Sequence, residues 1–222
     1  MSGVAIDLML RDAADHYHAG RPEPAEALCA DILRTHAGHL PALHLAAVIA
    51  IADDRLAEGT ELLGRVFALD PDHGPALVTL GDALADKGDR EGAVAAFRRA
   101  LARRPMDIGL HLKLGAVLLQ SARFAEAVPI YQRARELDPE RLRIQFDLAL
   151  SLAGDGRDAE AEELYSHVAA RDAAYRGAWL AFREFLGQRR SDDVIAPYRR
   201  AVDAKPTDPA AHGAIGMVLH RN

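Results

Sequence analysis

The chain has 222 residues, of which 50% are hydrophobic and 5% aromatic, and its formal net charge is −6. Its alanine- and leucine-rich composition, with few β-branched residues, favours helix. A negative chain of mixed charge disfavours general nucleic-acid binding, which needs a basic stripe. The single cysteine, Cys29, excludes a disulfide framework within the chain and favours a reducing compartment.

The N-terminus does not have the pattern of a signal peptide, because it has no basic region and Asp7 interrupts its apolar stretch. No apolar run approaches the ~18 residues of a membrane span. We therefore expect a soluble, cytoplasmic protein without membrane insertion. The alanine- and arginine-rich composition favours a bacterial source.

Prolines recur at a fixed interval, since Pro71, Pro105 and Pro139 are each 34 residues apart. A period of this size indicates a stacked array of short supersecondary units that behaves as one elongated domain. With Pro71 at position 32 of a unit, we expect a single array over residues 1–222. Its expected parts are repeats 6–39, 40–73, 74–107, 108–141, 142–175 and 176–208, and a terminal helix at 209–222.

The first two repeats match the pattern weakly. Their second-helix positions are held by Ala25, Cys29 and Ile32, and by Gly59, Leu63 and Val66. Cys29 stands where other repeats have an aromatic residue, and we interpret it as a small buried core residue. A catalytic thiol would need a nearby base and partial exposure, which nothing in the spacing supplies.

Repeat 74–107 shows the unit most clearly as two helices joined by a turn. Pro75 suits the first turn of a helix, Gly88 can end that helix with a positive φ, and Asp89 can cap the next. Pro105 stops the second helix. The small residues Gly81, Ala93 and Ala100 allow the two helices to approach closely, with Phe97 filling the space beside them.

Repeats 108–141 and 142–175 continue the interval. Matching positions hold Gly115, Ala127, Tyr131 and Ala134, and then Ala149, Ala161 and Tyr165. Gly154-Asp155-Gly156 could suggest a phosphate loop, but no strand precedes it and no GxxxxGK[ST] motif is present. We predict a turn there.

The stretch 175–198 in the last repeat is the most irregular. It holds five of the twelve aromatic residues, and Trp179 and Phe185 are either part of a locally repacked core or a hot spot for a partner or for self-association. The terminal helix is apolar where an end repeat is normally polar. This suggests that the natural protein continues beyond Asn222, or that a second chain covers the helix.

The pattern Leu77-x2-Leu80-Gly81-x2-Leu84, followed by Ala93-x3-Phe97-x2-Ala100 and Pro105, resembles the tetratricopeptide repeat (TPR). The resemblance covers six full repeats and a C-terminal half repeat. It implies an all-α fold, a right-handed superhelical solenoid of antiparallel helix-turn-helix repeats. It also implies that the first helices line a concave groove in which a partner peptide or helix lies.

Carried over by position, the expected groove residues are Arg11, His44, Val48, Val78, Asp82, Leu112, Lys113, Arg143, Phe146, Asp147, Leu150 and Glu184. Neither the carboxylate clamp of chaperone-tail binders nor the asparagine ladder of glycosyltransferase arrays is present, because Lys113 is isolated and Asn222 is the only asparagine. Aliphatic side chains with scattered charges better suit an amphipathic helix or an apolar segment.

No cofactor, metal or catalytic site is expected. The ten histidines include neither HExxH nor a metal-ligand pair, and we interpret His39 and His73 as solvated or capping residues. The arginine run Arg98, Arg99, Arg103 and Arg104 is interpreted as a solvated face with intrahelical ion pairs.

We therefore expect a non-enzymatic scaffold that binds a protein or peptide and no nucleic acid. Two alternatives stay open: the N-terminal, substrate-recruiting arm of a larger bacterial enzyme similar to glycosyltransferases or sulfotransferases, and a structural protein that self-assembles through its ends or through residues 175–198.

Overall fold

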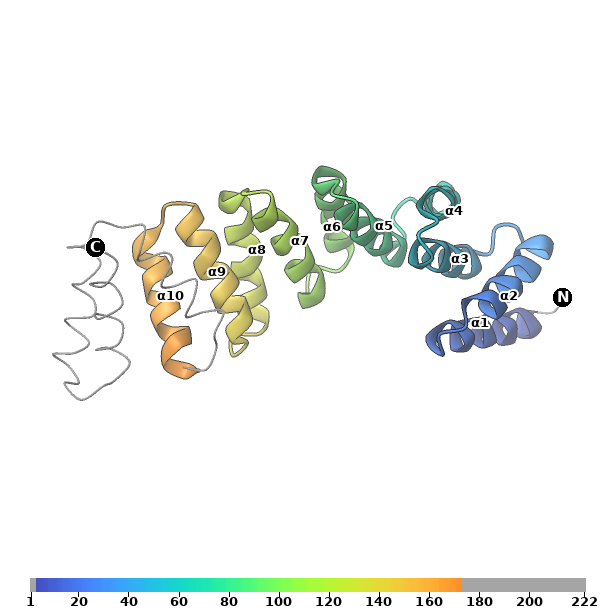
Figure 1. Cartoon of the computed structure of the whole chain (residues 1–222), viewed down its shortest axis with the longest axis horizontal. Helices are drawn as coiled ribbons and strands as arrows, with labels where there is room; N and C mark the ends of the chain where they lie inside the picture. Colours follow the sequence, from blue (N-terminus) through green and yellow to red (C-terminus); the bar gives the residue numbers. More distant parts are fainter. Residues whose placement is uncertain (1–2, 173–222) are drawn as a thin grey trace. The chain divides into compact units, whose positions relative to one another are not determined.

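The computed structural model describes residues 3–172, which form ten α-helices and no strand (Figure 1). The helices are α1 (Gly3–His18), α2 (Pro22–Thr35), α3 (Leu40–Ala52), α4 (Leu56–Leu69), α5 (Gly74–Asp86), α6 (Arg90–Arg103), α7 (Ile108–Gln120), α8 (Phe124–Leu137), α9 (Leu142–Gly154) and α10 (Asp158–Arg171). The expected all-α class is confirmed for this part of the chain. The predicted hot-spot residues Trp179 and Phe185, the groove residue Glu184 and the terminal helix lie outside the described residues.

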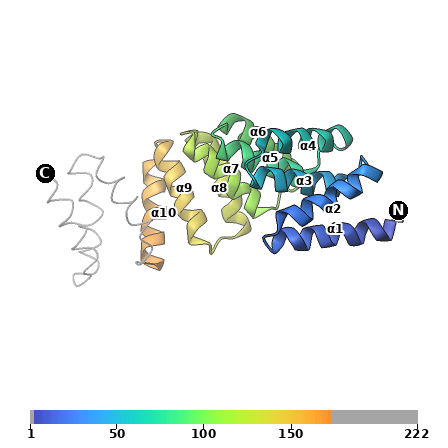
Figure 2. The ribbon, with the colours of Figure 1, turned by 45° about the vertical axis from the view of Figure 1, so that its right-hand side comes forward.

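The chain divides into two compact units, residues 1–123 and residues 124–222. Unit 1 contains α1 to α7, and the described part of unit 2 contains α8 to α10. In unit 1 the pairs α1–α2, α3–α4 and α5–α6 form consecutive helix hairpins (Figures 1 and 2). In unit 2, α9 packs against both α8 and α10.

A left-handed residue recurs every 34 residues, after the first helix of each repeat. The φ angle is 70° at Gly20, 82° at Gly88 and 78° at Gly156, which confirms the turns predicted at the last two. The same conformation occurs at Asp54 (φ 58°) and Ala122 (φ 54°), where the sequence offers no glycine. The interval therefore fixes the backbone conformation even where the residue type is unfavourable.

Helix starts also follow the interval. His39, His73 and Asp107 are each 34 residues apart, and each caps the following helix by accepting a hydrogen bond from a backbone N–H three residues on. The capping role expected for the two histidines is confirmed. Asp89 caps α6 in the same way, with a bond of 3.0 Å from the Gly92 N–H, as predicted.

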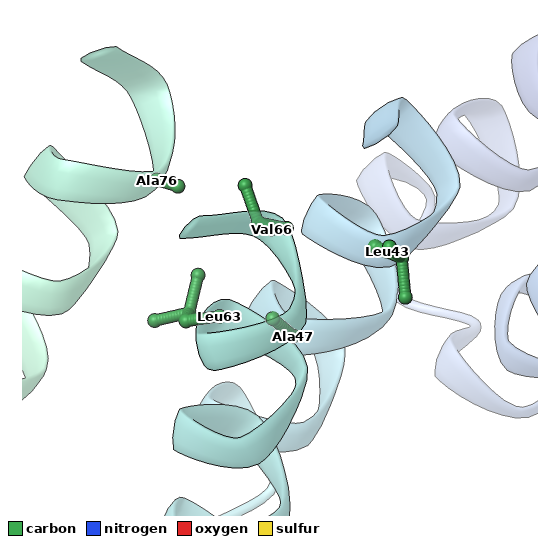
Figure 3. Close-up of a cluster of buried hydrophobic side chains, with 5 residues drawn as sticks. All are labelled: Leu43, Ala47, Leu63, Val66 and Ala76. Atoms are coloured by element: carbon green, nitrogen blue, oxygen red, sulfur yellow. The ribbon is translucent and has the colours of Figure 1, made fainter. Parts of the chain in front are cut away.

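The core of unit 1 runs from one hairpin into the next. Leu43 and Ala47 of α3, Leu63 and Val66 of α4, and Ala76 of α5 form one cluster, and all are at most 1% exposed (Figure 3). Since three helices from two repeats contribute to this cluster, neither repeat could bury its apolar side chains alone.

Small residues permit the close helix approach that the sequence predicts. A β-carbon on Gly81 would lie 2.5 Å from a ring carbon of Phe97, and Phe97 is only 1% exposed. Ala93 and Ala100 on the same side of α6 are completely buried. The glycine of α5 is therefore a steric requirement of the hairpin.

The described core of unit 2 is built around two tyrosines, Tyr131 of α8 and Tyr165 of α10, each 1% exposed. Ile144 and Leu148 of α9 are equally buried. Pro129 lies inside α8, where it removes one backbone hydrogen bond from the helix.

None of the helices within residues 3–172 has the length and apolar character needed to cross a bilayer.

Candidate functional site

The candidate site in unit 1 is the surface formed by the first helices of successive repeats. Helix α3 contacts α1 on one side and α5 on the other, so these first helices lie side by side. The residues of this first-helix face are His44, Val48, Val78, Asp82, Leu112 and Lys113. Five of them are half-buried and Lys113 is exposed, so each presents part of its side chain to solvent.

His44 joins two repeats across this face. Its Nε2 lies 2.9 Å from the hydroxyl of Thr79 on α5, and its ring lies 5.5 Å from that of His73. Burial lowers the pKa of His44 below its usual value, and the neighbouring imidazole of His73 lowers it further. His44 is therefore held in its neutral form at neutral pH.

Asp82 and Lys113 join the next pair of first helices. The Lys113 ammonium lies 2.6 Å from the Asp82 carboxylate, and the two side chains are 45% and 42% exposed. An exposed pair of this kind contributes at most about 1 kcal/mol to stability. Its effect on the face is local neutralisation, because the two opposite charges are held together.

Arg11 is exposed on α1 and contributes a further cation to unit 1. It forms no contact with the six residues of the first-helix face within the described part of the chain.

In unit 2, α9 carries four of the predicted groove residues. Arg143 Nε donates to both carboxylate oxygens of Asp147, at 3.0 and 2.8 Å, and the guanidinium lies 5.9 Å from the ring centre of Phe146. Phe146 in turn contacts Tyr165 edge-on at 6.0 Å. Leu150 completes the set and is 36% exposed.

The two members of the α9 ion pair differ greatly in burial. The Asp147 side chain is 8% exposed and that of Arg143 is 61% exposed. Burial raises the pKa of Asp147, and the hydrogen bond from Arg143 opposes that rise. Asp147 therefore positions the arginine, while Arg143, Phe146 and Leu150 provide the accessible surface.

Sequence reasoning missed a set of arginine contacts between the second helices of neighbouring repeats. Arg65 donates to the Ala37 carbonyl at 3.0 Å, and Arg99, 34 residues later, donates to the Pro71 carbonyl. Arg103 pairs with Asp72.

In unit 2, Arg171 pairs with Glu140 at 2.5 Å in the same register as Arg103 with Asp72. The expectation of intrahelical pairs was therefore wrong for Arg99 and Arg103, whose partners lie in the preceding repeat. The signal that could have found these contacts is the 34-residue spacing of the arginines.

Two other candidate sites have structural explanations. Cys29 is completely buried, and burial, followed by the charge of Glu26, raises the pKa of its thiol to about 11. Gly154 ends α9 and Gly156 adopts a positive φ in the turn before α10, as predicted. Among residues 3–172, no group of three or more His, Cys, Asp or Glu side chains is placed to hold a metal ion.

A profile of the tetratricopeptide repeat matches residues 50–117 and again residues 118–183. The chain belongs to the tetratricopeptide repeat family. The resemblance inferred from Gly81, Ala93, Phe97 and their counterparts is thereby confirmed.

Relatives of known name match only part of their own length. Human protein O-mannosyl-transferase TMTC1 is 29% identical over 138 residues, which is 62% of this chain and 16% of that protein. The peroxisomal targeting signal receptor of Eremothecium gossypii is 32% identical over 113 residues, 51% of this chain and 19% of the receptor. The chain thus spans less than a fifth of the length of these curated relatives.

Solved structures of TPR proteins share the fold. MamA of AMB-1 gives a TM-score of 0.66 at 22% identity, covering 78% of this chain and 94% of MamA. YrrB, described as a TPR protein with an unusual peptide-binding site, gives 0.68 at 16% identity, covering 78% of this chain and 89% of YrrB. At these identities the likeness establishes the fold alone.

Proposed function

We propose that this protein is an interaction scaffold whose first-helix face binds a peptide or an amphipathic helix of a partner protein. The observation that carries the proposal is the side-by-side placement of α1, α3 and α5, with Val48 and Val78 only half-buried on α3 and α5. The proposal includes the single array over residues 1–222 that the 34-residue interval predicts.

The chemistry of the face suits a partner of mixed character. Val48, Val78 and Leu112 offer apolar contact area, while Asp82 and Lys113 neutralise one another locally. Contacts between repeats, such as His44 with Thr79, hold the helices in place before a partner arrives. A preformed surface of this kind reduces the ordering cost of binding on the scaffold side.

The names of two similar proteins agree with this proposal. One is a targeting signal receptor, and the other is described as having a peptide-binding site. Since the identities are low or the coverage partial, they support the class of partner and not its sequence.

A peptide-display selection on the purified chain tests the proposal. Peptides selected on the wild type should bind Val78→Arg at least about tenfold more weakly, a loss of about 1.4 kcal/mol. The matched control is Ala95→Arg, which adds the same charge at an exposed position of the second helix α6 and should leave affinity unchanged. Equal binding to both variants would show that the first-helix face is not the binding surface.

A second candidate function is suggested by the similarity to a protein O-mannosyl-transferase. In that case the chain is a substrate-recruiting arm of a larger enzyme. Both functions use the same face, but they differ in the partner. If the peptides selected above are also modified faster by an enzyme joined to this chain than by the enzyme alone, the arm function is supported. Equal rates would contradict it.

A further inference from the structure

Three imidazoles gather where repeat 40–73 meets repeat 74–107 in unit 1. His39 and His73 cap α3 and α5, and His44 of α3 contacts both His73 and Thr79 of α5. Helices α3 and α5 contact one another directly. The two caps and the link between the helices therefore all depend on side chains that can gain a proton.

The hydrogen bonds define which nitrogen of each imidazole carries its proton. The backbone N–H groups of Ala42 and Ala76 donate to Nδ1 of His39 and His73, each at 3.3 Å. An accepting Nδ1 has no proton, so both rings must be neutral with the proton on Nε2. Protonation of either ring would convert its acceptor into a donor that faces another donor.

The tautomer of His44 follows from its partner. The Thr79 hydroxyl donates its only proton to the Pro75 carbonyl, at 3.1 Å, so His44 Nε2 is the donor in the contact with Thr79. The contact with Thr79 would therefore survive protonation of His44. The cost of protonation would come from burial and from the neighbouring ring of His73, which together lower the pKa of His44.

We propose that the joint between α3 and α5 is acid-sensitive: protonation of His39, His44 and His73 releases both helix caps and loosens the contact between the two repeats. A positive charge at a helix N-terminus is opposed by the helix dipole, which adds to the loss of each cap. Histidine is the side chain that changes charge between about pH 5 and about pH 8.

Neighbouring charges do not compensate the added protons, because they already have partners. None of the three imidazoles forms an ion pair within residues 3–172. The surrounding charged groups and their partners are Asp31 with Arg34 on α2, Glu58 with Arg55 at α4, Asp72 with Arg103 and Arg99 at α6, Arg104 with Asp107 before α7, and Asp82 of α5 with Lys113 of α7. Asp70 accepts from the Asp72 N–H, and Arg11 and Asp15 are exposed on α1.

The next repeat provides a built-in comparison. Asp107 occupies the position that His39 and His73 hold, and its carboxylate accepts from the Leu110 N–H at 3.1 Å. A carboxylate remains an acceptor at mildly acidic pH, so this cap is insensitive to the protons that would release the other two. The substitution of His39 and His73 by aspartate therefore tests the proposal with a side chain already used by the chain.

The experiment compares thermal unfolding at about pH 7.5 and about pH 5.5. The wild type should lose about 4–8 °C more in Tm than the double variant His39→Asp/His73→Asp, because two caps are released on acidification. His44→Gln keeps the donor to Thr79 and should remove a smaller part of the loss. The control is His167→Gln, exposed on α10 of unit 2, which should acidify like the wild type.

A titration of the wild type followed by NMR gives a second readout that needs no variant. The backbone amide signals of Ala42 and Ala76 should shift together with the side-chain signals of His39 and His73. If these amides do not respond, or if a folded double variant loses as much Tm as the wild type, the proposal is wrong.

Discussion

Ala122 adopts a left-handed conformation that alanine rarely accepts, and its replacement by glycine should stabilise the protein. Its φ is 54°, whereas the matching residue of the preceding repeat, Gly88, has a φ of 82°. The left-handed region costs a residue with a β-carbon roughly 1–2 kcal/mol. Glycine avoids that cost but loses about 0.4–1 kcal/mol through the greater freedom of the unfolded chain.

The difference of these terms gives a stabilisation of about 0.5–1 kcal/mol for Ala122→Gly. Gly88→Ala should destabilise by a similar amount, since a β-carbon at Gly88 would meet no atom within 4 Å and the effect is purely one of backbone conformation. In Tm these values correspond to shifts of about 1–4 °C in opposite directions.

The assay is thermal and urea unfolding, followed by circular dichroism. The matched control is Ala95→Gly, the same substitution at an exposed position inside α6, which should destabilise by about 0.5–1 kcal/mol because the backbone there is right-handed. If Ala122→Gly destabilises as Ala95→Gly does, the assignment of strain to Ala122 is refuted.

Four further predictions concern the two cores. Gly81→Ala should destabilise unit 1 by about 1–3 kcal/mol in a melting experiment, because the buried ring of Phe97 has no room to move; an unchanged Tm would contradict the close approach. Gln145→Leu should be neutral or stabilising by up to about 1 kcal/mol, since its Oε1 is buried without a hydrogen-bond partner, and a clear loss in urea unfolding would contradict this. Cys29 should react with a thiol reagent at about pH 8 only on unfolding, because a pKa of about 11 keeps it protonated, and rapid labelling of the folded chain would disprove its burial. Pro129→Ala should raise the Tm by restoring a backbone hydrogen bond in α8, with a gain of about 1–3 kcal/mol, and a lower Tm would show that the proline is favourable there.

The candidate site could be predicted from the sequence only in part. The interval identified which residues belong to first helices, so His44, Val78 and Asp82 were assigned to one surface before any coordinates were considered. It could not show that Asp147 is almost fully buried beneath Arg143, because the depth of a side chain depends on the helices packed around it. Nor could it show that His44 contacts Thr79, 35 residues away.

The sequence by itself determined the local structure of this protein. The starts and ends of helices and the left-handed turns follow from backbone rules that act over a few residues, as at Pro75, Gly88 and Asp89. Only the tertiary structure decided which arginines connect neighbouring repeats and that a division into two units falls between Arg123 and Phe124. The physical reason is range: a cap or a turn is a contact within one short segment, whereas these features depend on the balance of many contacts between helices far apart in the chain.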